Sequence, residues 1–178
     1  MNRRVFLSAA LLAVTPLIAQ TAPKKPPASP SATASATLSG KTITITYSAP
    51  GVKGREGQLF GKDGRISKDP HYPVWRAGAN SATTLKTDGD LMIGDLMVPA
   101  GSYTLFVDIS DPDNWTLIVN KQTGQWGLSY DAAQDLGKTK MTMTKPAAMV
   151  ENLVYTIDDA KLTLAWEDHS ASVPIMVH

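Results

Sequence analysis

The sequence predicts an all-β protein, an antiparallel β-sandwich of jelly-roll or Ig-like arrangement with about nine strands. The first observation is an alternation of apolar and polar residues along much of the chain after residue 37, which is typical of strands with one buried face. The second is the recurrence of turn signals roughly every 8–12 residues, as in antiparallel sandwiches and barrels. The third is that no long segment shows a clear helical period.

The first half of the domain contains five such strands. They are expected over residues 42–47, 81–87, 91–93, 96–98 and 102–109. In the first of them, Ile43, Ile45 and Tyr47 occupy alternate positions and are expected to face inward. Gly94 and Asp95 separate the third strand from the fourth, and this two-residue connection favours a hairpin.

The second half repeats the pattern. Its strands are expected over residues 115–120, 138–145, 152–157, 161–167 and 172–177, with a short helical turn at 131–135. The last strand is expected at an edge of a sheet, because Pro174 has no N–H to donate. Residues 51–73 differ from the rest, since they are rich in Gly, Lys and Asp and have little pattern. They predict a long loop, and long loops on β scaffolds often carry function.

Three segments are predicted along the chain: a signal peptide over 1–22, a linker over 23–37 and a single β-sandwich domain over 38–178. Arg3 and Arg4 precede an apolar run that is too short to span a bilayer as a stable helix. The same residues resemble the twin-arginine export motif. Pro, Ala, Ser and Thr dominate the linker, a composition with little to bury. An uncleaved N-terminal anchor is the alternative to a signal peptide.

Composition argues against several kinds of partner. All 16 acidic residues but only 13 of the 17 basic residues fall within 38–178, so the domain carries a net charge of −3. A mildly acidic domain without a basic stripe argues against nucleic acid. The chain contains no Cys, which excludes disulfides and a Cys-linked lipid anchor. A periplasmic or secreted protein is expected, without stable membrane insertion after signal cleavage.

Five short motifs, taken in order, resemble a known family. They are YSAPGVKGR at 47–55, VWRAGANSATT at 74–84, PAGSYTLF at 99–106, WTLIVNK at 115–121 and QWG at 125–127. This series is similar to domain of unknown function 2911, a family of secreted bacterial proteins. The resemblance implies a β-sandwich-like domain exported to the envelope, and it implies no activity. The connection between Arg55 and Val74 looks longer than in the family, so a function carried by this loop would be particular to this protein.

The strongest candidate site is the stretch that contains Trp75, Arg76 and Asn80. Arg has five donors in a fixed fork, Asn has both a donor and an acceptor, and a Trp face can pack on a ligand. Together they could bind a carboxylate or a sugar. Trp126, between two glycines, could add a stacking surface for a glycan. The structural alternative is that Arg76 and Asn80 hold loop carbonyls while the tryptophans fill the core.

Other chemical signatures are weak. Asp111, Asp113 and Asn114 do not follow a calcium-loop spacing and predict a solvated turn. The three histidines are too scattered for a zinc site, so neither a metal nor a cofactor is expected. Asp168, His169 and Ser170 are the residue types of a catalytic triad. Neighbours on one strand point to opposite faces, so these three residues cannot form a triad by themselves.

Three functions therefore stay open. The sequence favours a non-catalytic module of the cell envelope that binds a glycan or peptide through Trp75, Arg76, Asn80 and Trp126. One alternative is an envelope structural or assembly domain without a small ligand. The other is a hydrolase or metal-dependent enzyme that uses the loop around His71. The oligomeric state is not determined by the sequence.

Overall fold

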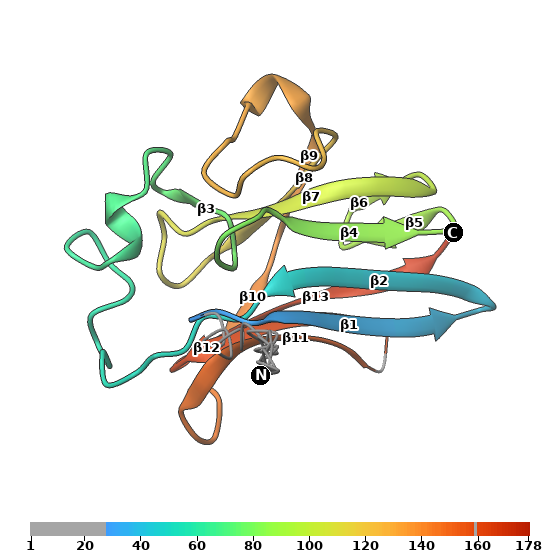
Figure 1. Ribbon diagram of the computed structural model, residues 1–178. Helices are drawn as coiled ribbons and strands as arrows, with labels where there is room; N and C mark the ends of the chain where they lie inside the picture. Colours follow the sequence, from blue (N-terminus) through green and yellow to red (C-terminus); the bar gives the residue numbers. More distant parts are fainter. Residues whose placement is uncertain (1–27, 159) are drawn as a thin grey trace, which may run out of the picture.

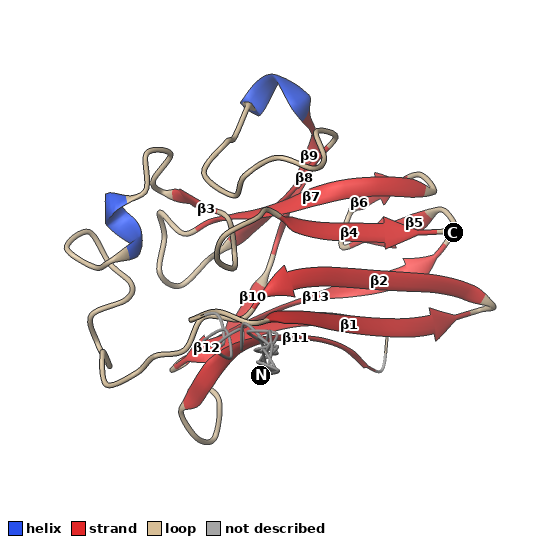
Figure 2. Ribbon diagram, in the orientation of Figure 1, coloured by secondary structure: helices blue, strands red, loops and turns tan. Residues whose placement is uncertain are grey.

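A computed structural model describes residues 28–158 and 160–178, which form two antiparallel sheets around one hydrophobic core (Figure 1). The all-β prediction is confirmed. The expected strand count of about nine is wrong, because the described residues form 13 strands. Two of the strands that were not expected as separate strands, β3 Val74–Trp75 and β10 Thr142–Thr144, span only two and three residues (Figure 2), and such segments are too short to show an alternation in the sequence. The predicted signal peptide over 1–22 lies outside the described residues.

The first sheet has the strand order β1-β2-β4-β7-β8-β9, and β3 pairs with β7 beside this path. Its strands are β1 Ser31–Leu38, β2 Lys41–Ser48, β3 Val74–Trp75, β4 Thr83–Thr87, β7 Gly101–Asp108, β8 Thr116–Asn120 and β9 Asp135–Lys140. The inward residues of β2 are Ile43, Ile45 and Tyr47, as the alternation predicts.

The second sheet has the order β11-β12-β13-β5-β6, and β10 pairs with β13. Its strands are β5 Leu91–Ile93, β6 Leu96–Val98, β10 Thr142–Thr144, β11 Val150–Asp158, β12 Lys161–Glu167 and β13 His169–Val177. The predicted hairpin turn at Gly94 and Asp95 is confirmed, because Ile93 pairs directly with Leu96. Two short 3-10 helices, η1 Ile66–Lys68 and η2 Ala132–Gln134, lie in connections between strands.

The first strand, β1, overturns the prediction of a linker for residues 31–37 of the segment 23–37. All eight of its residues pair with β2, from Ser31 opposite Ser48 to Leu38 opposite Lys41. Within β1, Ser and Thr alternate with Ala and then Leu38, so the strand has a polar face and a weakly apolar face. The weakly apolar face packs against the core. Because alanine is small, the alternation has low contrast in the sequence.

The last strand, β13, is an interior strand rather than the edge strand predicted from Pro174. It pairs with β12 on one side and with β5 on the other. The ladder continues around the proline, because its carbonyl accepts a hydrogen bond of 2.8 Å from the Gly94 N–H and Ile175 donates to the Ala160 carbonyl at 2.8 Å. The proline therefore leaves out one hydrogen bond while the bonds next to it keep both neighbouring strands paired.

The connections gather at the two ends of the sheets. The loop from residue 51 to 73 contains only η1, as expected for a long loop, and lies at the left in Figure 2. The β1–β2 turn and the end of β13 lie at the opposite end (Figure 1). In the part of the chain that the structure describes, no helix has the length and apolar character needed to cross a membrane.

Candidate functional site

A cavity of about 320 Å³ opens at the loop-bearing end of the sandwich. Its walls come from four parts of the chain: the residues before β1, the segment that follows β2, the loop after β3 and the end of β12. Two tryptophans, Trp75 and Trp166, form part of the lining together with Arg76. A volume of this size is at the lower end of the range for small-ligand pockets.

Pairing between β3 and β7 positions the tryptophan and the arginine. Trp75 lies opposite Val107 and is 2 % exposed, and its ring stacks on that of Trp166 with centroids 5.9 Å apart. Side chains alternate along a strand. Arg76 is the residue directly after β3, so its side chain points to a different side from that of Trp75. It lines the cavity.

The backbone that follows Arg76 is held by two buried hydroxyls. The Ala77 carbonyl accepts hydrogen bonds from Thr83 Oγ1 at 3.1 Å and from the Tyr155 hydroxyl at 2.9 Å. Ala77 itself has φ of 47°, a conformation that is uncommon for a residue with a side chain. Thus bonds from β4 and β11, distant in sequence, hold the turn that presents Arg76.

The guanidinium of Arg76 has unused hydrogen-bonding capacity. Its Nε is buried and has no hydrogen-bond partner among the described residues. Its nearest charged partner is Asp69, whose Oδ2 lies 3.9 Å from Nη2, beyond hydrogen-bond distance. Burial raises the pKa of the Asp69 carboxyl, while the Arg76 charge opposes that rise. Buried donors without partners are rare in folded proteins, and each calls for an explanation.

Three other cations line the same cavity: Lys53, Arg55 and Arg65. Arg55 donates to the carbonyls of Val52 at 2.7 Å and of Gly51 at 2.5 Å, so it holds the loop that forms the wall. The ammonium of Lys53 donates to the Ala28 carbonyl at 2.6 Å. For Arg65, no side-chain hydrogen bond or ion pair occurs within residues 28–158 and 160–178. Arg65 and Arg76 are therefore the two of the four cations whose side chains make no hydrogen bond within the described residues.

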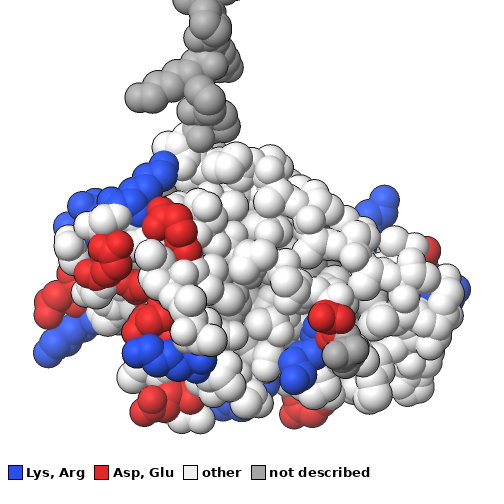
Figure 3. Space-filling view, turned by 90° about the horizontal axis from the view of Figure 1, so that it is seen from below, with Lys and Arg blue, Asp and Glu red and all other residues white. Residues whose placement is uncertain are grey.

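The cavity is positive although the domain is acidic. Four cations and one carboxylate, that of Asp69, line it. Figure 3 shows charged side chains gathered at this end of the molecule, whereas much of the rest of that face is uncharged. The indole N–H of Trp166 is also buried without a hydrogen-bond partner among the described residues. Cations and unpartnered donors together are complementary to an anion.

Asn80 and Trp126 lie beside the cavity without lining it. A β-bridge joins Ser81 to Trp126, and the Gly127 N–H donates to the Asn80 carbonyl at 2.9 Å. Trp126 is 54 % exposed. The structure therefore arranges the four predicted site residues as two pairs: Trp75 with Arg76 in the lining, and Asn80 with Trp126 outside it.

Gly127 is where these two pairs meet. A Cβ added there would lie 2.6 Å from Arg76 Cδ and 2.7 Å from the Asn80 carbonyl oxygen. We expect Gly127→Ala to lower the free energy of unfolding by about 1–3 kcal/mol, because overpacking of this kind forces neighbouring groups to move. Chemical denaturation measures the change.

Gly124→Ala is not a suitable control because Gly124 has φ of 78°. Ala133→Gly, at an exposed site in η2, is preferable, and a Gly127→Ala midpoint equal to wild type would contradict the packing.

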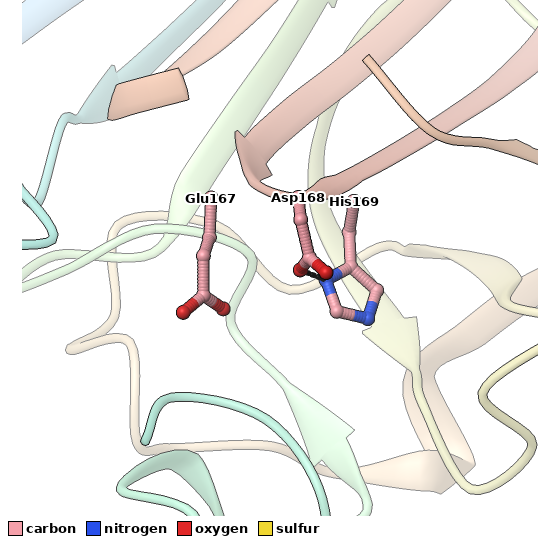
Figure 4. Close-up of side chains that lie close together, drawn as sticks. All are labelled: Glu167, Asp168 and His169. Atoms are coloured by element: carbon pink, nitrogen blue, oxygen red, sulfur yellow. Dashed lines mark ion pairs between the residues drawn. The ribbon is translucent and has the colours of Figure 1, made fainter. Parts of the chain in front are cut away.

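The hairpin between β12 and β13 brings together Glu167, Asp168 and His169 (Figure 4). Asp168 Oδ1 and His169 Nδ1 are 2.7 Å apart, although they lack hydrogen-bond geometry. The expectation that these two neighbours point apart is wrong, because Asp168 lies in the turn and not on a strand: Trp166 pairs directly with His169. Glu167 has φ of 56°, as tight two-residue hairpins require.

The contacts of this group are structural. Glu167 accepts a hydrogen bond from the Gly57 N–H and so ties the long loop to the hairpin. Asp168 also pairs with Lys145 at 3.8 Å. The His169 ring stacks on Trp115, with centroids 5.4 Å apart and an interplanar angle of 10°. His71, which the enzyme alternative invoked, is exposed and contacts Tyr130. The structure does not bring His71 together with the hairpin group.

Sequence reasoning missed Lys53, Arg55, Arg65, Asp69 and Trp166 as pocket residues. Four of the five lie in the loop over 51–73, and the abundance of charged residues in that otherwise patternless segment was the available signal. Trp166 belongs to the hydrophobic core and is only 6 % exposed. Its contribution to the cavity depends on where β12 ends.

Comparison with known proteins gives one match. The family model described as "Protein of unknown function (DUF2911)" matches residues 29–175. The match includes all of β1, in agreement with its place in the first sheet. Neither a curated protein nor a solved structure matches the chain.

Proposed function

We propose that this chain, which belongs to the DUF2911 family, is a non-catalytic binding module of the cell envelope. Its pocket takes the carboxylate group of a glycan or peptide. The observation that carries the proposal is Arg76, a guanidinium at the wall of a cavity with a buried, unpartnered Nε and only a long contact to Asp69. A planar fork with free donors suits a carboxylate, which it can bind through two parallel hydrogen bonds.

The charge of the pocket lining also supports carboxylate binding. The pocket is lined by four cations and one carboxylate, whereas the domain as a whole is mildly acidic. An anion is therefore repelled by most of the surface and attracted at this point. The pocket lining contains no histidine, so its side chains supply binding and orientation in preference to proton transfer near neutral pH.

Trp126 and Asn80 extend the proposed site. Both are exposed and lie next to the loop that presents Arg76. In this proposal the ligand's carboxylate enters the pocket, and a sugar or peptide portion covers the indole face of Trp126, where an apolar surface can pack on it. A peptidoglycan fragment combines carboxylate, sugar and peptide in one molecule and is the ligand class of choice.

The proposed location follows from the N-terminal sequence and is separate from the pocket. The paired arginines and the apolar run support export to the periplasm or beyond. Cell fractionation with a C-terminal tag tests it. Recovery of the full-length chain in the cytoplasm would contradict the proposal, and recovery of a shortened chain in the periplasm or medium would support it.

Thermal unfolding with added ligand tests the binding function. A peptidoglycan fragment at about a hundred times its Kd is expected to raise Tm by roughly 5–10 °C. Neutral oligomers of N-acetylglucosamine and inorganic phosphate are the comparison ligands. Arg76→Gln is expected to weaken binding about 10- to 100-fold, since it removes a charge-assisted contact. Asp69→Asn is expected to strengthen binding, because it removes the carboxylate that competes for Arg76.

Lys62→Gln is the matched control, since Lys62 lies in the loop over 51–73 that supplies the other lining cations but does not itself line the cavity. It should bind as the unaltered protein does. If Lys62→Gln and Arg76→Gln weakened ligand binding equally, the loss would come from the change in net charge alone. That result would contradict a specific site at Arg76. A lack of any shift with the peptidoglycan fragment would favour the alternative of a structural envelope domain. A rise in Tm of equal size with phosphate would show that the pocket binds anions in general and does not select a carboxylate.

A further inference from the structure

Three methionines lie side by side on the outer face of the second sheet. Met97 on β6 is the direct partner of Met92 on β5, and Met92 is the direct partner of Met176 on β13. Directly opposed residues in antiparallel strands point to the same face, with Cβ atoms about 4.5–5.5 Å apart. We call Met92, Met97 and Met176 the methionine row.

The methionine row is directed away from the core. Met97 is 39 % exposed and Met176 is 54 % exposed, while Leu91, Ile93 and Ile175, their neighbours on alternate positions, are fully buried. Single exposed apolar residues are ordinary. Here, however, Met97 and Met176 are exposed and Met92 between them is half-buried, so three adjacent strands carry a thioether on the same face of the sheet.

An imidazole stands next to the row. The His178 N–H donates to the Asp90 carbonyl at 2.9 Å, so pairing between β13 and the segment before β5 continues one step beyond Val177. Since side chains alternate along a strand, His178 shares the face of Met176. The Asp90 carboxylate already accepts a hydrogen bond of 2.7 Å from the Ala100 N–H. This place therefore offers three sulfurs and one imidazole, beside a carboxylate that already accepts one hydrogen bond.

We propose that the methionine row is a binding site for Cu(I), with His178 as an additional ligand. Thioethers are soft ligands that select Cu(I), and imidazole also suits copper. A methionine side chain has three rotatable bonds and a polarizable sulfur, so the two outer side chains can lean toward Met92 and enclose a small ion. The step is binding alone and needs no change of oxidation state.

The ligand set and its position separate this site from the anion pocket. Hard cations such as Ca²⁺ and Mg²⁺ prefer oxygen ligands, whereas the methionine row offers sulfur. The row lies where β13 ends, whereas the pocket lies at the other end of the sandwich, where the long loop is found (Figure 1). The proposed Cu(I) site and the proposed carboxylate binding are therefore independent, and failure of one would not contradict the other.

Titration of the purified protein with Cu(I) under reducing conditions, in competition with a chromophoric Cu(I) chelator, tests the proposal. One equivalent is expected to bind, and Ag⁺, a redox-inert ion of similar softness, is expected to compete for it. Met92→Leu, Met97→Leu and Met176→Leu retain size and apolar character. Each is expected to weaken Cu(I) binding at least tenfold, with the largest effect at the central Met92, and His178→Gln is expected to weaken it less.

Met149→Leu is the matched control, because Met149 is 48 % exposed and lies outside the row. It should leave the Cu(I) affinity unchanged. The proposal is overturned if the unaltered protein does not take Cu(I) from the chelator, if the three row variants bind as the unaltered protein does, or if Met149→Leu weakens binding equally. Thermal unfolding of each variant confirms that the fold is kept, so that weakened binding by a stable variant supports the site.

Discussion

Trp75→Ala is expected to lower the free energy of unfolding by about 3–5 kcal/mol, the usual cost of deleting a large buried aromatic side chain. Trp75 is 2 % exposed and contacts the rings of Phe60, Trp115 and Trp166, with centroid separations of 5.7, 6.0 and 5.9 Å. The alanine would leave a cavity beside all three. Because Trp75 also lines the pocket, the same change is expected to abolish ligand binding.

Urea denaturation followed by circular dichroism measures this loss. Trp126→Ala is the matched control: Trp126 is 54 % exposed, and its removal is expected to change the free energy of unfolding by no more than about 0.5 kcal/mol. The two variants thus separate the aromatic that supports the fold from the one proposed to contact ligand. Equal losses in the two variants would contradict the arrangement.

Deletion of β1 is expected to have the second large effect. A chain that begins at residue 39 loses the strand that pairs with all of β2. Burial of its alanine methyl groups and of part of Leu38 is worth on the order of 3 kcal/mol, so Tm is expected to fall by roughly 6–12 °C. Exposure of β2 as a new edge is also expected to promote aggregation.

The comparison chain begins at residue 28 and keeps β1 together with Ala28 and Ser29, which line the pocket. It should unfold at the same temperature as the mature protein. If the chain that begins at residue 39 were equally stable, the segment over 31–37 would act as a linker after all, as its composition first indicated. Differential scanning calorimetry of both chains, at several protein concentrations, distinguishes instability from aggregation.

The strands were predictable where alternation is strong. In β2 the contrast between Thr and Ile or Tyr is high, and the inward residues follow from it. In β1 the contrast between Ser or Thr and Ala is low, so the composition of the segment predicts a linker where the structure has a strand. The edge position predicted for β13 was wrong for a different reason. A proline prevents one hydrogen bond at one position, and the bonds of Gly94 and Ile175 on either side maintain the ladder.

The site was predictable only in part. Trp75 and Arg76 were found because a tryptophan and an arginine adjoin in a glycine-containing stretch, and the structure places both at the pocket. The cations of the loop over 51–73 were missed because no local pattern relates them to Arg76. The methionine row has no local pattern either, because Met92 and Met176 are far apart in the chain. In addition, the spacing of His, Asp and Glu says nothing about thioether ligands.

The all-β class, the inward residues of the stronger strands and the tight turn at Gly94 and Asp95 follow from the sequence, because they depend on contrasts between near neighbours. The choice of which strands pair depends on the tertiary structure, and it places Met92 between Met97 and Met176 and Trp166 against Trp75. The physical reason is that a two-residue period specifies which face a side chain occupies but is the same for every partner strand and for every shift of register by two residues. Only packing of the two sheets selects one pairing, and both proposed sites depend on that selection.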